Sequence, residues 1–160
     1  MVPIATQTPV TEQIQGLVQA SFARRYDDLA AMLRDARAAV ALTEEPPEEL
    51  PAELVVKAWT QLGNAYRITG CYAEAEQALA RAGAIPISDL PTSIHLIEVQ
   101  ASLHRNTGRY DCAACLLGCA IAAQEPLGNP AGKARLYIQL GIVELDAARL
   151  LTLRAAHLKE

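Results

Sequence analysis

The chain has 160 residues, enough for one compact domain or a short array of repeats with its own hydrophobic core. Its net charge of −4 gives no basic surface for nucleic acids or anionic membranes, and no run approaches the about 18 apolar residues of a membrane-spanning helix. Apolar residues make up 51% of the chain and are rich in Ala and Leu, which favours helices over sheets.

The first residues of the chain are rich in Thr and Pro, and we expect a frayed lead-in up to about residue 10. This stretch lacks the basic and apolar regions of a secretory signal. Three of the four cysteines are crowded into one predicted helix, where they cannot cross-link distant loops. We therefore expect reduced thiols and a cytoplasmic protein.

Residues 11–42 predict a pair of helices. Thr11 is a candidate N-cap, and Tyr26 is expected to open the second helix after the Arg24–Arg25 pair. Apolar residues with helical spacing are expected to face inward in both helices: Ile14, Leu17, Val18 and Phe22, then Leu29, Leu33, Ala36 and Val40.

Residues 43–51 read T-E-E-P-P-E-E-L-P, and three prolines within six residues forbid a continuous helix. The four glutamates indicate either a solvated connector or an acidic contact patch.

Residues 52–83 show the clearest pattern in the chain. Trp59, Leu62 and Tyr66 form one stripe of a first helix, and Gly63 beside them lets a partner helix approach closely. Gly70 ends this helix. A second helix then continues an apolar stripe: Tyr72, Ala75, Leu79 and Ala82.

The same pattern returns 38 residues later, within residues 92–123. Gly70 and Tyr72 are followed at this offset by Gly108 and Tyr110. At the same offset from the other motif residues, Trp59, Leu62, Gly63, Tyr66, Ala75, Leu79 and Ala82, stand Ile97, Gln100, Ala101, His104, Ala113, Leu117 and Ala120. A constant offset over two helices indicates an internal repeat.

Residues 131–159 begin like a further copy, with Tyr137, Leu140 and Gly141 in the places of Trp59, Leu62 and Gly63. The pattern then decays, and no helix breaker stands between residues 133 and 159, so the last two helices can run together as one. Five leucines leave an apolar end: Leu145, Leu150, Leu151, Leu153 and Leu158. Terminal repeats need a polar outer face. This apolar end therefore predicts that the last helices dock on a partner or on a second copy of the chain, or that the chain is part of a longer array of repeats.

The motif W-x2-L-G-x2-Y, followed by G-x-Y-x2-A-x3-L-x2-A, resembles the tetratricopeptide repeat (TPR), most closely over residues 56–123. Leu79 departs from the family pattern, which usually has Phe there. The resemblance implies an all-α, right-handed solenoid of three to four helix-turn-helix hairpins within a single domain, residues 1–160. The hairpins would span residues 11–42, 52–83, 92–123 and 131–159, with the first and last degenerate.

The family also implies where a partner binds, because TPR first helices line a concave groove. The residues that would face it are Lys57, Thr60, Gln61, Asn64, Arg67, His95, Glu98, Ser102, Arg105, Arg135, Ile138 and Gln139. With Asn64, Arg67 and Arg105 would hold a carboxylate or a peptide backbone. The alternative is that these are ordinary solvated helix faces. The subset of TPRs that clamp a C-terminal carboxylate matches poorly, since Thr60 stands where Lys is expected.

Three thiols, Cys112, Cys115 and Cys119, share one face of a predicted helix. They either pack as small apolar side chains or begin a metal or redox site, although a fourth zinc ligand with motif spacing is lacking. His95 and His104 point to opposite sides of their helix and cannot chelate one ion together. No catalytic motif or phosphate-binding loop is present in the sequence, and we expect neither cofactor nor metal.

The sequence therefore predicts a non-catalytic scaffold that binds a peptide or a partner protein in a concave groove, without nucleic acid or membrane partners. Two alternatives remain open: a structural or regulatory module that self-associates through the apolar C-terminal helices, and a small chaperone of the TPR type.

Overall fold

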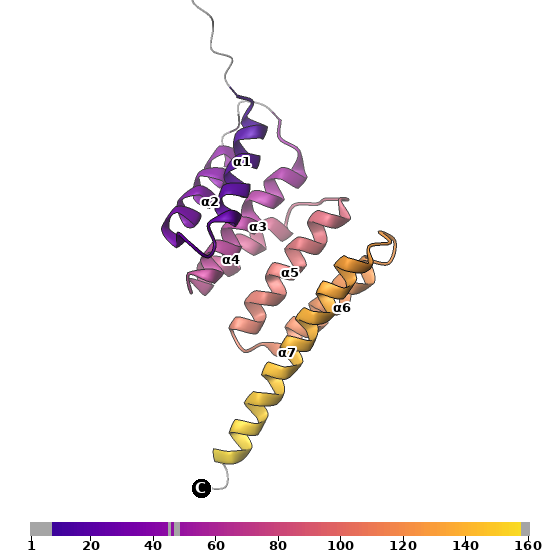
Figure 1. Cartoon of the computed structure of the whole chain (residues 1–160). Coiled ribbons are helices and arrows are strands. Elements are labelled where there is room, and N and C mark those ends of the chain that lie inside the picture. The colour runs from indigo at the N-terminus through magenta and orange to yellow at the C-terminus, as the bar shows by residue number, and fades with distance from the viewer. Residues whose placement is uncertain (1–7, 45, 47–48, 158–160) are drawn as a thin grey trace, which may run out of the picture. The chain divides into compact units, whose positions relative to one another are not determined.

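The computed structural model describes residues 8–44, 46 and 49–157, with side chains up to Ala155. The all-α prediction is confirmed: over the described residues the chain forms helices and no strand. These helices are α1 (Val10–Ala23), α2 (Leu29–Glu44), α3 (Ala52–Ile68), α4 (Tyr72–Gly83), α5 (Leu90–Asn106), α6 (Tyr110–Ala123) and α7 (Pro130–His157) (Figure 1).

The helices fall into two compact units, residues 1–87 with α1–α4 and residues 88–160 with α5–α7. The predicted lead-in over residues 1–7, part of the acidic connector (Glu45, Pro47 and Glu48) and Leu158 lie outside the described residues. Among the described helices, none has both the length and the apolar character needed to cross a bilayer.

The 38-residue offset of the sequence is also an offset of helix boundaries. Helices α3 and α5 each have 17 residues and start 38 residues apart. Helices α4 and α6, of 12 and 14 residues, also start 38 residues apart. Both hairpins turn at a glycine with positive φ, 80° at Gly70 and 75° at Gly108, a conformation that side chains with a Cβ disfavour. The residue after each glycine donates its N–H to the helix before it, Cys71 to Tyr66 and Arg109 to His104, at 2.9 and 2.8 Å.

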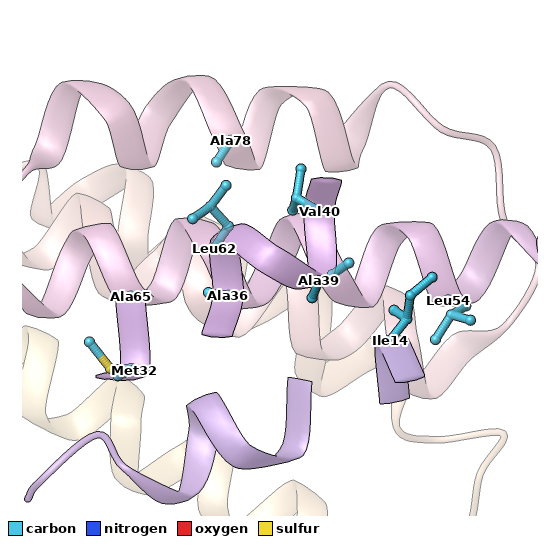
Figure 2. Close-up of a cluster of buried hydrophobic side chains, with 10 residues drawn as sticks. Ile14, Met32, Ala36, Ala39, Val40, Leu54, Leu62, Ala65 and Ala78 are labelled. Carbon is cyan, nitrogen blue, oxygen red and sulfur yellow. The ribbon is translucent and has the colours of Figure 1, made fainter. Parts of the chain in front are cut away.

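The core of residues 1–87 lies where α1 and α2 both pack against α3, which also packs on α4. The buried side chains come from all four helices, and Figure 2 shows most of them: Ile14, Met32, Ala36, Ala39, Val40, Leu54, Ala58, Leu62, Ala65 and Ala78. The close helix approach predicted at Gly63 is present, because a Cβ added there would lie 2.6 Å from Leu79 Cγ. Gly63 therefore sets the distance between α3 and α4.

A buried chain of hydrogen bonds fastens the first hairpin to α3. Gln61 Nε2 donates to Ser21 Oγ at 2.9 Å, and this hydroxyl donates to the carbonyl oxygen of Met32 at 2.8 Å. Gln61 and Ser21 are both buried. Because buried polar groups without partners are costly, the two bonds fix how α1, α2 and α3 meet.

In residues 88–160, α6 packs against both α5 and α7. The shared core contains Ile94, Ala101, Ala113, Leu117, Ala120, Leu136 and Val143. Helix α7 runs for 28 residues without a break, as the absence of a helix breaker predicted. Gly141 lies within it with nothing within 4 Å of an added Cβ, so it does not repeat the close contact of Gly63.

Some side chains that the sequence pattern assigned to the core are exposed to solvent. The second helix begins at Leu29, not at Tyr26, and Tyr26 lies in the turn with 80% of its surface exposed. Phe22 is also exposed, and the Arg25 Cζ lies 3.8 Å from its ring centroid and 4.4 Å from the Tyr26 ring centroid. Tyr72, expected in the core, is 37% exposed at the start of α4.

Candidate functional site

An open groove of about 490 Å³ lies between α1 and the N-terminal half of α3. Both helices and the residue before α3 contribute to it. Its lining consists of Thr11, Gln15, Val18, Gln19, Pro51, Glu53, Leu54 and Lys57.

The groove has an apolar floor and polar edges. Leu54 is buried and Val18 is half-buried, whereas Gln15, Gln19 and Lys57 are exposed. Gln15 and Gln19 are four residues apart, which places their amides side by side along α1. An amide can both donate and accept hydrogen bonds, so this edge matches the alternating groups of an extended peptide backbone.

Lys57 is the predicted partner-binding residue that lines this groove. Three others on α3, Thr60, Gln61 and Asn64, are buried. Gln61 is committed to the link with Ser21, and Asn64 Oδ1 accepts hydrogen bonds from Arg67 Nε and Nη2 at 3.2 and 2.8 Å. Asn64 and Arg67, which were expected to receive a carboxylate, are therefore hydrogen-bonded to each other.

Four of the predicted residues in the second unit meet in one polar cluster between α5 and α7. Arg135 donates from Nε and Nη2 to the two carboxylate oxygens of Glu98 at 3.0 and 3.1 Å, and Gln139 Nε2 donates to Glu98 Oε1 at 3.3 Å. His95 Nδ1 lies 3.8 Å from Glu98 Oε2. The bidentate pair joins two helices that share few other close contacts, so a structural link is its evident role here.

The Glu98 carboxyl has a pKa below its ordinary value. Burial alone would raise this pKa, but the nearby His95 imidazole and the charge and hydrogen bonds of Arg135 outweigh the burial. Glu98 is therefore held as a carboxylate beneath the Arg135 guanidinium.

The remaining predicted residues do not gather into a site of their own. Arg105 Nε lies 3.8 Å from Asp146 Oδ2 on α7, a second link between these helices. Ser102 is half-buried on α5, and Ile138 is exposed on α7.

The cysteine packing prediction is wrong. Cys112, Cys115 and Cys119 are all exposed, and only Cys71 is half-buried. The small side chains that face the neighbouring helices of α6 are instead Ala113 and Ala120. Among the described residues, no group of three or more His, Cys, Asp or Glu side chains has the arrangement of a metal site.

The α1 side of the groove was not predicted, because the sequence motif that indicates binding residues occurs only in the later hairpins. The signal that could have found it is the pair Gln15 and Gln19, one helical turn apart and next to the half-buried Val18. Comparison of the chain with family models, curated proteins and solved structures finds no match.

Proposed function

We propose that this chain is a non-catalytic interaction module, a short TPR-like solenoid that binds an extended peptide of a partner protein in the groove between α1 and α3. The observation that carries the proposal is the groove itself, with Lys57 and the Gln15–Gln19 edge over the apolar floor of Leu54 and Val18. The TPR-like motif of α3 and α4 and the 38-residue helix repeat support the family assignment.

The mechanism is presentation by a rigid surface. The Gln61–Ser21 bond fixes α1 against α3 before any ligand arrives, so ordering of the groove adds little to the entropic cost of binding. The glutamine amides would bond the peptide backbone, the floor would take one apolar side chain, and Lys57 would favour an acidic residue next to it.

Selection of peptides from a displayed random library on the purified chain tests this function. Gln19→Ala and Lys57→Ala, combined, are expected to weaken a selected peptide about tenfold, the loss expected for one or two hydrogen bonds with a charged member. Arg34→Ala is the matched control, because Arg34 is exposed on α2 outside the groove. The proposal fails if no peptide is selected or if the control weakens binding as much as the groove variant.

A second candidate function is self-association through α7, and one observation favours it. Large hydrophobic side chains on this helix that are more than half exposed are Tyr137, Ile138, Leu145, Leu151 and Leu153. Exposed apolar patches of this kind mark interaction sites. Light scattering tests the idea, since a mass that stays monomeric over a wide range of concentrations excludes it.

A further inference from the structure

Three cysteines lie on the solvent-exposed side of α6. Cys112, Cys115 and Cys119 are all exposed, although Cys is among the residue types most often buried in proteins. The opposite side of the same helix includes Ala113 and Leu117, which are buried in the core of the second unit. Packing therefore does not explain the three thiols, and their reactivity toward a ligand is the remaining property that this face offers.

The spacing of these cysteines makes Cys115 the shared member of two close pairs. Cys112 precedes Cys115 by three residues, and Cys119 follows it by four. Both separations bring the Cβ atoms of a helix to about 5–6 Å from each other. Cys112 and Cys119 are about 10 Å apart along the helix axis, too far for one ion to bridge. A two-thiol site on this face must therefore contain Cys115.

The geometry of such a pair favours a bound metal ion over a disulfide. A disulfide draws its two Cβ atoms to about 3.5–4.5 Å, which is closer than a regular helix places them. A metal–thiolate bond is about 2.3 Å long, so an ion in line between two sulfurs holds them about 4.6 Å apart. Two side chains with Cβ atoms about 5–6 Å apart reach this sulfur separation without distorting the helix.

The number of ligands selects the kind of ion. Among the described residues, no three His, Cys, Asp or Glu side chains are arranged to hold one ion, so a pair of thiolates is what the protein supplies. Zinc takes four protein ligands in structural sites and three in catalytic sites. Cu(I) is a soft ion that prefers thiolates, and two of them satisfy it in a linear arrangement.

We propose that the exposed face of α6 binds one Cu(I) ion between two thiolates, with Cys115 as the common ligand and Cys112 or Cys119 as the second. Cu(I) takes the place of the two thiol protons, which pass to solvent, and no oxidation state changes. The site goes beyond the proposed function, because none of its residues lines the α1–α3 groove.

Titration of the reduced chain with Cu(I), without oxygen and against a chromogenic Cu(I) chelator, tests the proposal. We expect one ion per chain, ultraviolet absorption from copper–thiolate charge transfer, and no change of mass in light scattering when the ion is added. Zn(II) is the comparison ion. Since it lacks the further ligands it needs, it is expected to bind at least about a hundredfold more weakly.

Single serine variants assign the ligands. Cys115→Ser should weaken Cu(I) binding more than about a hundredfold, because even the loss of a group that only orients a metal ligand costs about 10- to 100-fold. Cys112→Ser and Cys119→Ser each leave one complete pair and should weaken binding at most about tenfold. Cys71→Ser is the matched control, since Cys71 is half-buried and lies in the other unit. Circular dichroism verifies that each variant keeps its helix content.

Four results would overturn the proposal. These are no uptake of Cu(I) from the chelator, affinity for Zn(II) equal to that for Cu(I), a mass that doubles when the ion is added, and a loss in Cys115→Ser no larger than that in its neighbours or in Cys71→Ser. Peptide binding in the α1–α3 groove is expected to be unchanged in Cys115→Ser. The two proposals therefore fail separately.

Discussion

The distance between α3 and α4 depends on Gly63 having no side chain. The Gly63→Ala substitution measures the free energy that is lost when a Cβ is added there. The new Cβ would lie 2.6 Å from Leu79 Cγ and 2.7 Å from Leu79 Cδ2, so one helix or the leucine must move by about 0.8 Å to reach ordinary contact. Overpacking of this size costs about 1–3 kcal/mol. Alanine offsets about 1 kcal/mol of this cost through its better helix propensity, which leaves a net loss of up to about 2 kcal/mol.

Urea unfolding followed by Trp59 fluorescence measures the loss, because Trp59 is on the same helix as Gly63. Gly16→Ala is the matched control within the same unit: Gly16 lies inside α1 with nothing within 4 Å of an added Cβ, so this change should stabilise by up to about 1 kcal/mol. A double-mutant cycle with Leu79→Ala should show coupling of about 1 kcal/mol or more, since the smaller side chain leaves room for the Cβ.

Two results would refute the reasoning about Gly63. One is a Gly63→Ala variant stabilised as much as the control, which would mean that the glycine is only a weak helix former. The other is an additive cycle, which would mean that Leu79 is not the obstacle.

Three further predictions concern the second unit, a turn and the thiols. Glu98 has a lowered pKa in the folded chain, so its contribution to stability is complete above the unfolded pKa, ordinarily 4.5, and is lost as pH falls through the lowered folded pKa. Glu98→Gln should therefore make the urea midpoint less sensitive to acid. An unchanged pH profile would contradict the link between Glu98 and Arg135. Gly70→Ala should cost about 1 kcal/mol from its positive φ alone, because the added Cβ meets nothing within 4 Å, and a fluorescence-detected midpoint equal to that of the parent chain would argue against a left-handed turn. The three exposed thiols of α6 should react with Ellman's reagent in the native state faster than the half-buried Cys71. If these three thiols do not react, they are buried and the prediction is wrong.

Local rules of the sequence predicted a large part of the fold. The spacing of apolar residues and the turn glycine Gly70 act over a few residues, and the structure places them in the expected helices and turn. Gly63 acts between two helices that adjoin in sequence, and its expected close contact is present. The unbroken α7 follows from equally local reasoning, because nothing in its sequence stops a helix.

Side-chain partners were predicted less well, because they depend on which helix lies opposite. Asn64 and Arg67 have the residue types of a ligand clamp, yet they bond each other on one helix. Periodicity assigns Cys115 to a face of α6, but it does not say that the neighbouring helices occupy the other face. The α1 edge of the groove was not predicted for the same reason, since Gln15 and Gln19 form a groove edge only when α1 lies beside α3.

Helix α7 is supported unequally along its length. Leu136 and Val143 anchor its first half in the core of the second unit, whereas residues 151–155 are all exposed, and Figure 1 shows this end continuing past α5 and α6. Helical backbone without packing opens readily. Amide protons should therefore exchange with deuterated solvent along a gradient in α7, slowly before residue 144 and fast after residue 150, so that one continuous helix opens in two kinetic stages.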